Sequence, residues 1–196
     1  MIIGICGLIG SGKGTTSDIL VREYNFQKIS FADALKDTVS TLFKWDRTLL
    51  EGDTIESRQW REQPDNYWSA ELGKTVTPRL VLQLVGTECM RHGFYDGIWT
   101  SIVKKTILDN PTINWVIPDL RFKNEIEMLR SIDGKIWEVT TNNDPKWKVQ
   151  YEQNNVIPDN IHISEWDWIK VPKDIIIHNT STKEYINTQI EKIIKR

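Results

Sequence analysis

The chain has 196 residues and a nearly balanced charge, because 25 Lys and Arg stand against 27 Asp and Glu for a formal net charge of −2. This length predicts one domain that buries a core of its own. Proteins that work on nucleic acid usually carry a basic excess, so the balance disfavours a nucleic-acid partner. The apolar runs are too short to cross a membrane, and the strand predicted at the N-terminus does not fit a signal peptide, so we expect a cytoplasmic protein.

Two cysteines, Cys6 and Cys89, lie in apolar surroundings and lack the spacing of metal ligands. They are predicted to be buried thiols in a reducing compartment. Nine tryptophans are many for this length. We expect most of them to serve core packing, and a few to stack on a base or enclose a sugar.

The predicted elements alternate between strand and helix. Short apolar runs predict strands at residues 2–6, 26–30, 113–117, 136–139 and 174–178. Apolar periodicity predicts a helix from the loop after the first strand to about residue 24, and further helices over 32–43 and 97–108. Another begins at Pro78 and continues through Leu82, Val85 and Cys89. A fifth carries Ile126, Leu129 and Ile132 and ends at Gly134. A last helix opens with the capping-box spacing of Ser181 and Glu184.

Several of the strands are apolar throughout, which is typical of strands covered on both faces. Together with the alternation, this predicts a three-layer α/β/α fold around a five-stranded parallel sheet, with ligands at one sheet edge. We expect a single domain over residues 1–196. Two polar, weakly periodic stretches interrupt the alternation, and we interpret 51–77 as a substrate-binding insertion and 141–173 as a lid or irregular arm.

The N-terminal strand leads into Gly7-Leu8-Ile9-Gly10-Ser11-Gly12-Lys13-Gly14-Thr15, which then opens a helix. Glycines let successive N–H groups turn inward, and these groups bind phosphate together with the helix N-terminus. Lys13 is expected to bridge the outer phosphates of ATP during transfer. The residues predicted to bind ATP are Gly10, Ser11, Gly12, Lys13, Gly14, Thr15 and Thr16.

Gly14 departs from the general phosphate-loop pattern, in which a Ser or Thr after the lysine contacts Mg²⁺. Thr15, Thr16 or a water is therefore left to contact the metal. The run Gly-Lys-Gly-Thr resembles that of adenylate-kinase-like nucleoside monophosphate kinases. The resemblance narrows the function from any nucleotide triphosphatase toward a small-molecule kinase.

The strand predicted at residues 113–117 is followed by Asp119 and Arg121. An Asp at this position can hold Mg²⁺ through water or accept a hydrogen bond from a substrate, and the alternative is a helix N-cap. Arg121 is placed to reach phosphates at the strand edge, and Glu125 is expected to pair with it on the next helical turn. Lys13, Arg121 and Asp119 are the predicted catalytic residues, and Thr15 and Asp119 the predicted metal ligands.

A monophosphate acceptor needs cations for its phosphate and polar or aromatic groups for its base and sugar. The middle of the chain supplies these types in Lys36, Arg58, Arg61, Arg79, Gln83, Thr87, Arg91 and Trp99. On the helix after Pro78, Arg79, Gln83, Gly86 and Thr87 fall on or near one face, and Gly86 would let a ligand approach the backbone. Each of these polar residues taken alone is better explained as a solvated surface group, and their grouping makes an acceptor site an equal alternative.

Several segments together resemble the deoxynucleoside monophosphate kinases of tailed bacteriophages. The matching segments are residues 10–15, Ser30-Phe31-Ala32-Asp33-Ala34-Leu35-Lys36, Arg79-x-x-x-Gln83-x-x-Gly86-Thr87-Glu88, Trp99, Asp119-Leu120-Arg121-Phe122-x-Asn124-Glu125, His162-Ile163-Ser164-Glu165 and Asn179-Thr180-Ser181. The resemblance covers nearly the whole chain. It implies a P-loop fold of the nucleoside monophosphate kinase type.

The resemblance also implies an activity, namely transfer of the ATP γ-phosphate to a deoxynucleoside monophosphate (dNMP), with Mg²⁺, to supply deoxynucleotides for phage DNA synthesis. It implies ATP contacts at Ser11, Gly14 and Thr15, with Lys13 on the transferring phosphates. The positions that match dNMP ligands are Arg79, Gln83, Gly86, Thr87, Trp99 and Asp119, joined by Lys36 and one of Arg58 or Arg61. Family members differ where this chain has Gly14 and Leu80, so the accepted bases are not transferable.

Three points stay open in the sequence. Another small-molecule kinase, such as a dephospho-coenzyme A kinase, shares the loop and the size, and a nucleotide-binding switch is a rival of another class. Arg130 is an alternative to Arg121 for the charge of the transition state, and residues near Asn179 are expected to touch adenine. ATP and the acceptor are the expected partners, and whether the chain forms a homodimer is undecided.

Overall fold

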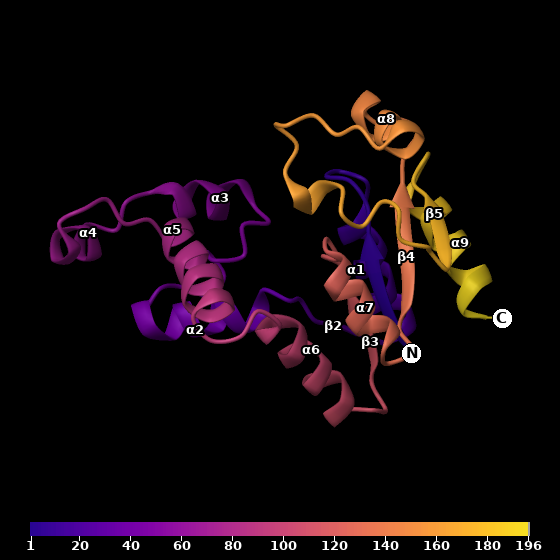
Figure 1. Ribbon diagram of the computed structural model, residues 1–196. Helices are drawn as coiled ribbons and strands as arrows, with labels where there is room; N and C mark the ends of the chain where they lie inside the picture. Colours follow the sequence, from indigo (N-terminus) through magenta and orange to yellow (C-terminus); the bar gives the residue numbers. More distant parts are fainter. Residues whose placement is uncertain (196) are drawn as a thin grey trace. The chain divides into compact units, whose positions relative to one another are not determined.

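The computed structural model describes residues 1–195 (Figure 1). The chain divides into two compact units, of which unit 1 comprises Met1–Ser30 and the chain from Val103 onward, and unit 2 comprises Phe31–Ile102. None of the helices formed by the described residues has both the length and the apolar character that a membrane crossing requires.

Unit 1 is built on a parallel sheet of five strands. They are β1 (Ile2–Cys6), β2 (Phe26–Lys28), β3 (Asn114–Ile117), β4 (Lys135–Thr140) and β5 (Ile175–His178), in the order β2-β3-β1-β4-β5. All five predicted strands are confirmed, with ends that shift by one or two residues. The order places β1, the strand that leads into the glycine-rich loop, at the centre of the sheet.

Helices cover both faces of this sheet. Ile3 on β1 belongs to one core cluster with Ile19 of α1 (Lys13–Tyr24) and Ile190 of α9 (Lys183–Ile194). Gly4 faces the other way, where a Cβ would come 2.3 Å from Leu120 and 2.4 Å from Leu129 of α7 (Lys123–Arg130). Because neighbouring residues of a strand point to opposite faces, the predicted three-layer α/β/α architecture is confirmed.

The start of α9 differs from the prediction by one residue. Thr182 is the N-cap, since its side chain accepts a hydrogen bond from the backbone N–H of Tyr185. The spacing of Ser181 and Glu184 predicted Ser181 as the N-cap, but Ser181 lies one residue before the N-cap that the structure shows. Threonine serves as a cap nearly as well as serine, so spacing alone does not choose between them.

Unit 2 is helical. It contains α2 (Asp33–Phe43), α3 (Ile55–Glu62), α4 (Asn66–Leu72), α5 (Pro78–Gln83), the π-helix η1 (Leu84–His92) and the start of α6 (Ile98–Asp109). Its core is aromatic, because Trp45 stacks on Phe43 at 4.6 Å between ring centroids and lies edge-on to Trp60 at 5.9 Å. The indole of Trp45 donates to Asp65 Oδ2 at 2.7 Å. These tryptophans therefore serve packing.

Residues 51–77 contain two helices despite their weak apolar periodicity. The stretch forms α3 and α4, whose N-termini are capped by the side chains of Thr54 and Asp65. These helices are only 8 and 7 residues long. Apolar periodicity cannot identify so short a helix, whereas a capping side chain stabilises it directly.

Residues 141–173, here called the arm, also contain helical turns, namely α8 (Lys146–Asn154) and the 3-10 turn η2 (Ile163–Glu165). Buried Lys148 attaches α8 to the sheet, with its Nζ 2.5 Å from Asp144, 3.2 Å from Glu152 and 3.8 Å from Glu138 on β4. Burial lowers the pKa of Lys148, but the hydrogen bonds to Asp144 and Glu152 outweigh it and leave the pKa raised. The charged form therefore persists in the protein.

The two cysteines differ. Cys6 is buried as predicted, and burial raises its pKa to about 12. Cys89 is exposed, contrary to the prediction. The predicted stripe through Leu82, Val85 and Cys89 assumed an α-helical period, but the chain winds as a π-helix from Leu84 onward. The wider turn of a π-helix rotates later residues away from the face that the α-period assigns them.

Candidate active site

The glycine-rich loop between β1 and α1 has the backbone of an anion cradle. Gly10 and Gly12 have φ of 78° and 103°, a conformation that favours glycine. Gly12 is the N-cap of α1 and supplies no side-chain hydrogen bond, whereas α3, α4, α5 and α9 are capped by side chains. The N-terminal amides of α1 are thus not covered by a cap, as a phosphate site requires.

Asn179, which follows β5, holds this loop in place. Its Nδ2 donates to the carbonyl of Ser11 at 2.9 Å, and a Cβ on Gly12 would come 2.5 Å from the same nitrogen. The sequence suggested an adenine contact near Asn179. The structure shows that this side chain contacts the phosphate loop, because β5 and β1 are parallel and both end at the same edge of the sheet, and the adenine contact stays a prediction.

Two buried hydroxyl oxygens, Ser11 Oγ in the loop and Thr16 Oγ1 in the first turn of α1, have no hydrogen-bond partner among the described residues. Ser11 lies within the cradle, so its hydroxyl fits a phosphate oxygen. Thr16 is 0% exposed, while Thr15 is partly exposed. Of the two threonines predicted to contact Mg²⁺, Thr15 is therefore the one that solvent reaches.

Lys13 bends back over the loop. Its Nζ donates to the carbonyls of Gly7 and Leu8, both at 2.8 Å. Burial lowers the pKa of Lys13, the positive charge of Arg121 lowers it further, and Glu165 and Asp119 oppose the shift. An added anion stabilises the charged form of a buried ammonium that lies beside another cation. A phosphate bound here would therefore interact favourably with Lys13.

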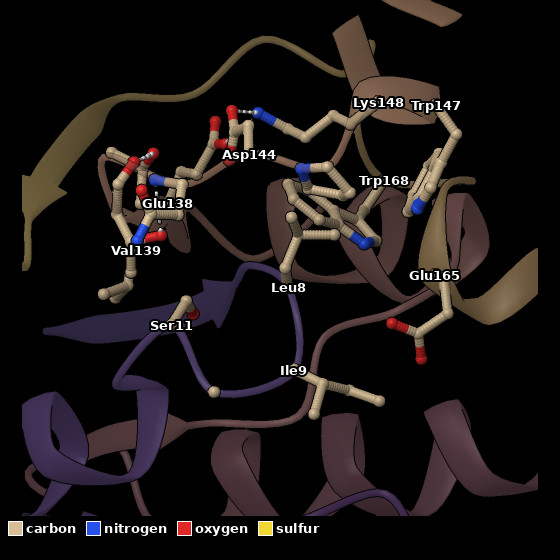
Figure 2. A pocket seen from close by; sticks show the side chains of 15 residues that line it. Leu8, Ile9, Ser11, Glu138, Val139, Asp144, Trp147, Lys148, Glu165 and Trp168 are labelled. Carbon is tan, nitrogen blue, oxygen red and sulfur yellow. Dashed lines mark hydrogen bonds and ion pairs between the residues drawn. The ribbon is translucent and has the colours of Figure 1, made fainter.

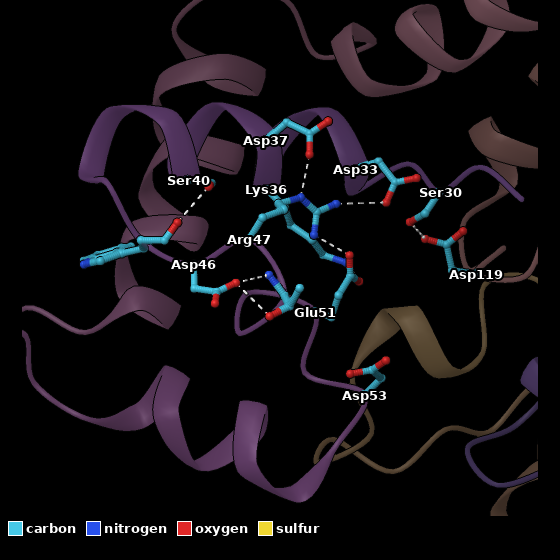
Figure 3. Close-up of polar contacts among 12 residues, drawn as sticks. Ser30, Asp33, Lys36, Asp37, Ser40, Asp46, Arg47, Glu51, Asp53 and Asp119 are labelled. Atoms are coloured by element: carbon cyan, nitrogen blue, oxygen red, sulfur yellow. Dashed lines mark hydrogen bonds and ion pairs between the residues drawn. The ribbon is translucent and has the colours of Figure 1, made fainter.

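Asp119 lies beyond the end of β3, as predicted. Its Oδ2 accepts a hydrogen bond from Ser30 Oγ at 2.5 Å (Figure 3), and Ser30 follows β2, the neighbour of β3. The alternative interpretation of Asp119 as a helix N-cap is wrong, because α7 begins at Lys123 with Phe122 as its N-cap. Asp119 is therefore not occupied by capping.

The predicted ion pair between the side chains of Arg121 and Glu125 is wrong, because Glu125 bonds the backbone of Arg121 and not its guanidinium. Buried Glu125 accepts from the backbone N–H groups of Arg121 and Phe122, at 2.8 and 3.1 Å, and so caps α7. The guanidinium of Arg121 instead lies 3.2 Å from the carboxylate of Glu165 on the arm. A contact across 44 residues of sequence leaves no periodic signal.

Arg130, the alternative to Arg121, lies at the wrong edge of the sheet. It donates to Asp174 Oδ2 at 2.6 Å, and Asp174 precedes β5 and accepts from the backbone N–H of Ile136 near the start of β4. The amino ends of these strands are opposite to the edge at which the glycine-rich loop follows β1. Arg130 therefore pins strand starts and does not reach transferring phosphates.

Figure 2 shows a cavity of about 250 Å³ beside the glycine-rich loop. Residues 8–11 form one wall, and the end of β4 continues it. The arm forms the remainder through Trp147, Lys148, Glu165 and Trp168. The aromatic and charged side chains of the arm thus enclose space next to the phosphate cradle.

Unit 2 carries a cluster of arginines. Arg58, Arg61 and Arg79 line one cavity of about 500 Å³, together with Gly52, Gln59, Glu62 and Gln63. Arg58 donates to the carbonyls of Gly52 and Asp53, both at 3.0 Å, and Arg79 pairs with Glu62 at 2.9 Å. The sequence predicted Arg79 and one of Arg58 or Arg61 as phosphate ligands, and the structure brings all three together.

Arg61 is the cation of this cluster with the greatest need of an anion. Its Nε is buried and has no hydrogen-bond partner among residues 1–195. Burial lowers the pKa of Arg61, and the charge of neighbouring Arg79 lowers it further. Gly52 has φ of 69°, and a Cβ there would lie 1.9 Å from Arg61 Nη2, so another residue would be strained and would displace this guanidinium. Gly52 was not named among the predicted site residues. A glycine within a polar stretch was the signal that could have identified it.

Lys36 belongs to a separate ionic cluster on α2. Its Nζ lies 2.6 Å from Glu51 Oε2, and Arg47 contacts Glu51, Asp33 and Asp37 (Figure 3). Burial raises the pKa of Glu51, but its hydrogen bonds to Lys36 and Arg47 outweigh burial and hold the pKa below its ordinary value. Glu51 therefore stays ionised and fixes the position of the Lys36 ammonium.

The remaining predicted acceptor residues lie on the helix from Pro78 to His92 or against it. Gly86 is buried against Leu35, whose Cδ2 would lie 2.7 Å from an added Cβ. Trp99 is 6% exposed and donates from Nε1 to the Gly86 carbonyl at 3.0 Å. Gln83 is exposed and Thr87 half-buried. Packing explains Gly86 and Trp99 here, and substrate contacts of all four stay predictions.

The side chains of residues 1–195 do not gather into a cluster of the kind that holds a metal ion by itself. In the part of the chain that the structure describes, no three His, Cys, Asp or Glu side chains gather as a metal cluster. Mg²⁺ in kinases is typically held by one or two protein oxygens together with substrate phosphates. Asp119 and Thr15 offer oxygens of this type, and their roles as Mg²⁺ ligands stay predictions.

No established family profile matches the chain. It is similar to a protein of Acanthamoeba polyphaga mimivirus that carries the name of a deoxynucleotide monophosphate kinase, with 29% identity over 97% of this chain and 94% of that protein. A deoxynucleoside-5'-monophosphate kinase of Escherichia phage T5 is 46% identical over 56 residues, which are 28% of this chain and 22% of the phage protein. Among solved structures, a dephospho-CoA kinase from Campylobacter jejuni superimposes with a TM-score of 0.51 at 16% identity, covering 99% of this chain and 95% of the other.

The phosphate loop follows the central strand of a parallel α/β sheet, and the chain shares this P-loop fold with a solved kinase. Together with the kinase names of the viral relatives, this fold supports a phosphotransferase with a nucleotide-binding P-loop. The predicted resemblance to viral deoxynucleoside monophosphate kinases is confirmed over nearly its whole length by the mimivirus relative, and over a segment by the phage relative.

Proposed function

We propose that the protein is a deoxynucleoside monophosphate kinase, which transfers the γ-phosphate of ATP to a dNMP and releases dNDP and ADP. The names of the viral relatives support this acceptor class. The observation that carries the proposal is the cluster of Arg58, Arg61 and Arg79, because the chain then has a cation site for a second phosphate in addition to its P-loop. Its role would be to supply deoxynucleotides for phage DNA synthesis.

The mechanism assigned to this chain is in-line transfer by positioning and charge stabilisation. The amides of residues 10–15 and Lys13 bind the donor phosphates, and Arg121 balances charge that develops on the transferring group. Asp119 and Thr15 would hold Mg²⁺, which when bound neutralises phosphate charge. An acceptor phosphate is already ionised at neutral pH, so no strong general base is required.

Arg58, Arg61 and Arg79 in unit 2 bind the acceptor phosphate in this proposal. Arginine suits a phosphate because its planar fork makes two parallel hydrogen bonds. Lys36, Gln83, Gly86, Thr87, Trp99 and Asp119 remain predicted acceptor contacts. The arm and the 51–77 segment are proposed to exclude water, which would otherwise hydrolyse ATP.

An acceptor panel tests the proposed activity. ADP release in a coupled assay should be stimulated by at least one dNMP, measured across the deoxy and ribo forms of each base. Dephospho-coenzyme A belongs in the same panel, because stimulation by it alone would favour the rival kinase. Slow hydrolysis that no acceptor accelerates would instead support a nucleotide-binding switch and refute the proposal.

Replacing Arg61 by alanine is expected to raise the KM for the dNMP about tenfold to a hundredfold, which corresponds to loss of one or two charge-assisted hydrogen bonds. The KM for ATP should change little, since the donor binds to other residues. Steady-state kinetics with each substrate varied in turn measures both constants. Arg22→Ala, which removes an exposed arginine paired with Glu23 on α1, is the matched control, and an equal rise there would remove the assignment.

A further inference from the structure

Two carboxylates of the arm contact the segment between β3 and α7. Asp167 accepts a hydrogen bond from the backbone N–H of Lys123 at 2.7 Å. Glu165 pairs with the side chain of Arg121, with 3.2 Å between Oε1 and Nη1. The arm is therefore attached to this segment at two points that differ in kind.

The two attachments differ in what can displace them. Asp167 is bonded to the backbone amide of Lys123 in the first turn of α7, where an acid is stabilised by the helix N-terminus, and its other oxygen lies 3.6 Å from Nζ of the same lysine. Among the residues that the structure describes, the carboxylate of Glu165 pairs with Arg121 alone, whose side chain is 44% exposed against 23% for Glu165. Exposed ion pairs are weak, so a stronger anion can take Arg121 from Glu165 while Asp167 keeps its bond.

Glu165 also lies beside the phosphate cradle. It lines the same cavity as residues 8–11, and Figure 2 shows its carboxylate pointing toward the loop. Arg121 and Glu165 are close enough to Lys13 to act on its pKa in opposite directions. A donor phosphate bound to Lys13 would thus meet a cation that is already occupied by a protein carboxylate.

We propose that Glu165 is a positioning residue that holds Arg121 beside the P-loop as a stand-in for phosphate, and that ATP displaces it and thereby releases one of the two attachments of the arm. This inference rests on the proposed kinase function, because it assigns Arg121 to the donor phosphates. A polyphosphate competes well for the guanidinium, since it offers more charge and more acceptor oxygens than one carboxylate. Asp167 then keeps the arm tethered while the side of it that carries Glu165 moves.

Calorimetric titration of ATP with Mg²⁺ tests the proposal on the full-length protein. Glu165→Gln keeps the shape of the side chain but removes its charge, so the competitor for Arg121 is lost. We expect ATP to bind about threefold to fivefold more tightly than to the wild type, the effect of one exposed ion pair. Damage to the fold would weaken binding, so tightening is a readout that a merely structural role does not produce.

Asp167→Asn is the matched control, because it removes the same charge two residues away without touching Arg121. It should leave ATP affinity unchanged or weaker. In an Arg121→Ala background, Glu165→Gln should change the affinity less than twofold. Equal tightening in both single variants would show a general charge effect and overturn the proposal, as would unchanged or weaker binding in Glu165→Gln. A wild-type protein that fails to bind ATP would instead refute the kinase function itself.

Discussion

Replacing Lys13 by alanine is expected to lower kcat for phosphoryl transfer about a thousandfold or more, the range seen when a main charge-stabilising group is removed. The ammonium is half-buried between two loop carbonyls and close to Arg121. It is thus held beside the cradle before a ligand arrives. Water cannot take over the role of the ammonium, because it carries no net charge that is held in place beside the transition state.

The fold should survive this change. The loss of two hydrogen bonds to Gly7 and Leu8 costs about 1–2 kcal/mol at most, since water can reach the freed carbonyls. Circular dichroism and thermal melting check the fold, and a coupled assay measures kcat. Lys105→Ala, on a lysine whose side chain is 76% exposed, is the control. Turnover of Lys13→Ala within tenfold of the wild type would refute the assigned mechanism.

Replacing Gly12 by alanine is expected to destabilise the protein by about 2–4 kcal/mol and to weaken ATP binding strongly. One part is backbone strain, because φ of 103° is unfavourable for any residue with a Cβ. The other part is a clash, because the new Cβ would lie 2.5 Å from Asn179 Nδ2. Relief of either strain would deform the cradle whose amides bind phosphate.

A double-mutant cycle separates the two causes. Asn179→Ala alone loses one hydrogen bond, at a cost of about 1 kcal/mol. The combined Gly12→Ala/Asn179→Ala variant should be less destabilised than the sum of the two, because the clash is absent and only backbone strain remains. Gly14→Ala is the control for stability, since nothing lies within 4 Å of its Cβ position. Additive effects in the denaturant midpoints would show that Asn179 does not restrict Gly12.

The sheet and the phosphate loop could be predicted from the sequence because both leave local patterns. Strands covered on two faces are apolar runs, and the loop needs glycine at fixed spacing. The short helices α3 and α4 could not be predicted, since their stability comes from the caps of Thr54 and Asp65 and from the tryptophan core. The π-helix was likewise unpredictable from an α-helical period, which explains the error at Cys89.

The candidate site was predicted in its residue types more than in its contacts. Arg121 and Arg61 were named as phosphate-binding cations, which stays a prediction, and their neighbours in the fold were not foreseen. Glu165 contacts Arg121 from another segment, and Gly52 makes room for Arg61 from outside any predicted helix. Such contacts depend on how the chain folds back, for which a single sequence carries no periodic signal.

The sheet order has a consequence for folding during synthesis. β1 is made first, yet both of its neighbours, β3 and β4, begin only at Asn114 and Lys135. Asn179, which holds Ser11, is made later still. The ribosome must therefore deliver most of the chain before the nucleotide site can form, and the apolar first strand stays exposed to chaperones and to aggregation during that time. Nucleotide binding by nascent chains should appear only after residue 179 has left the exit tunnel.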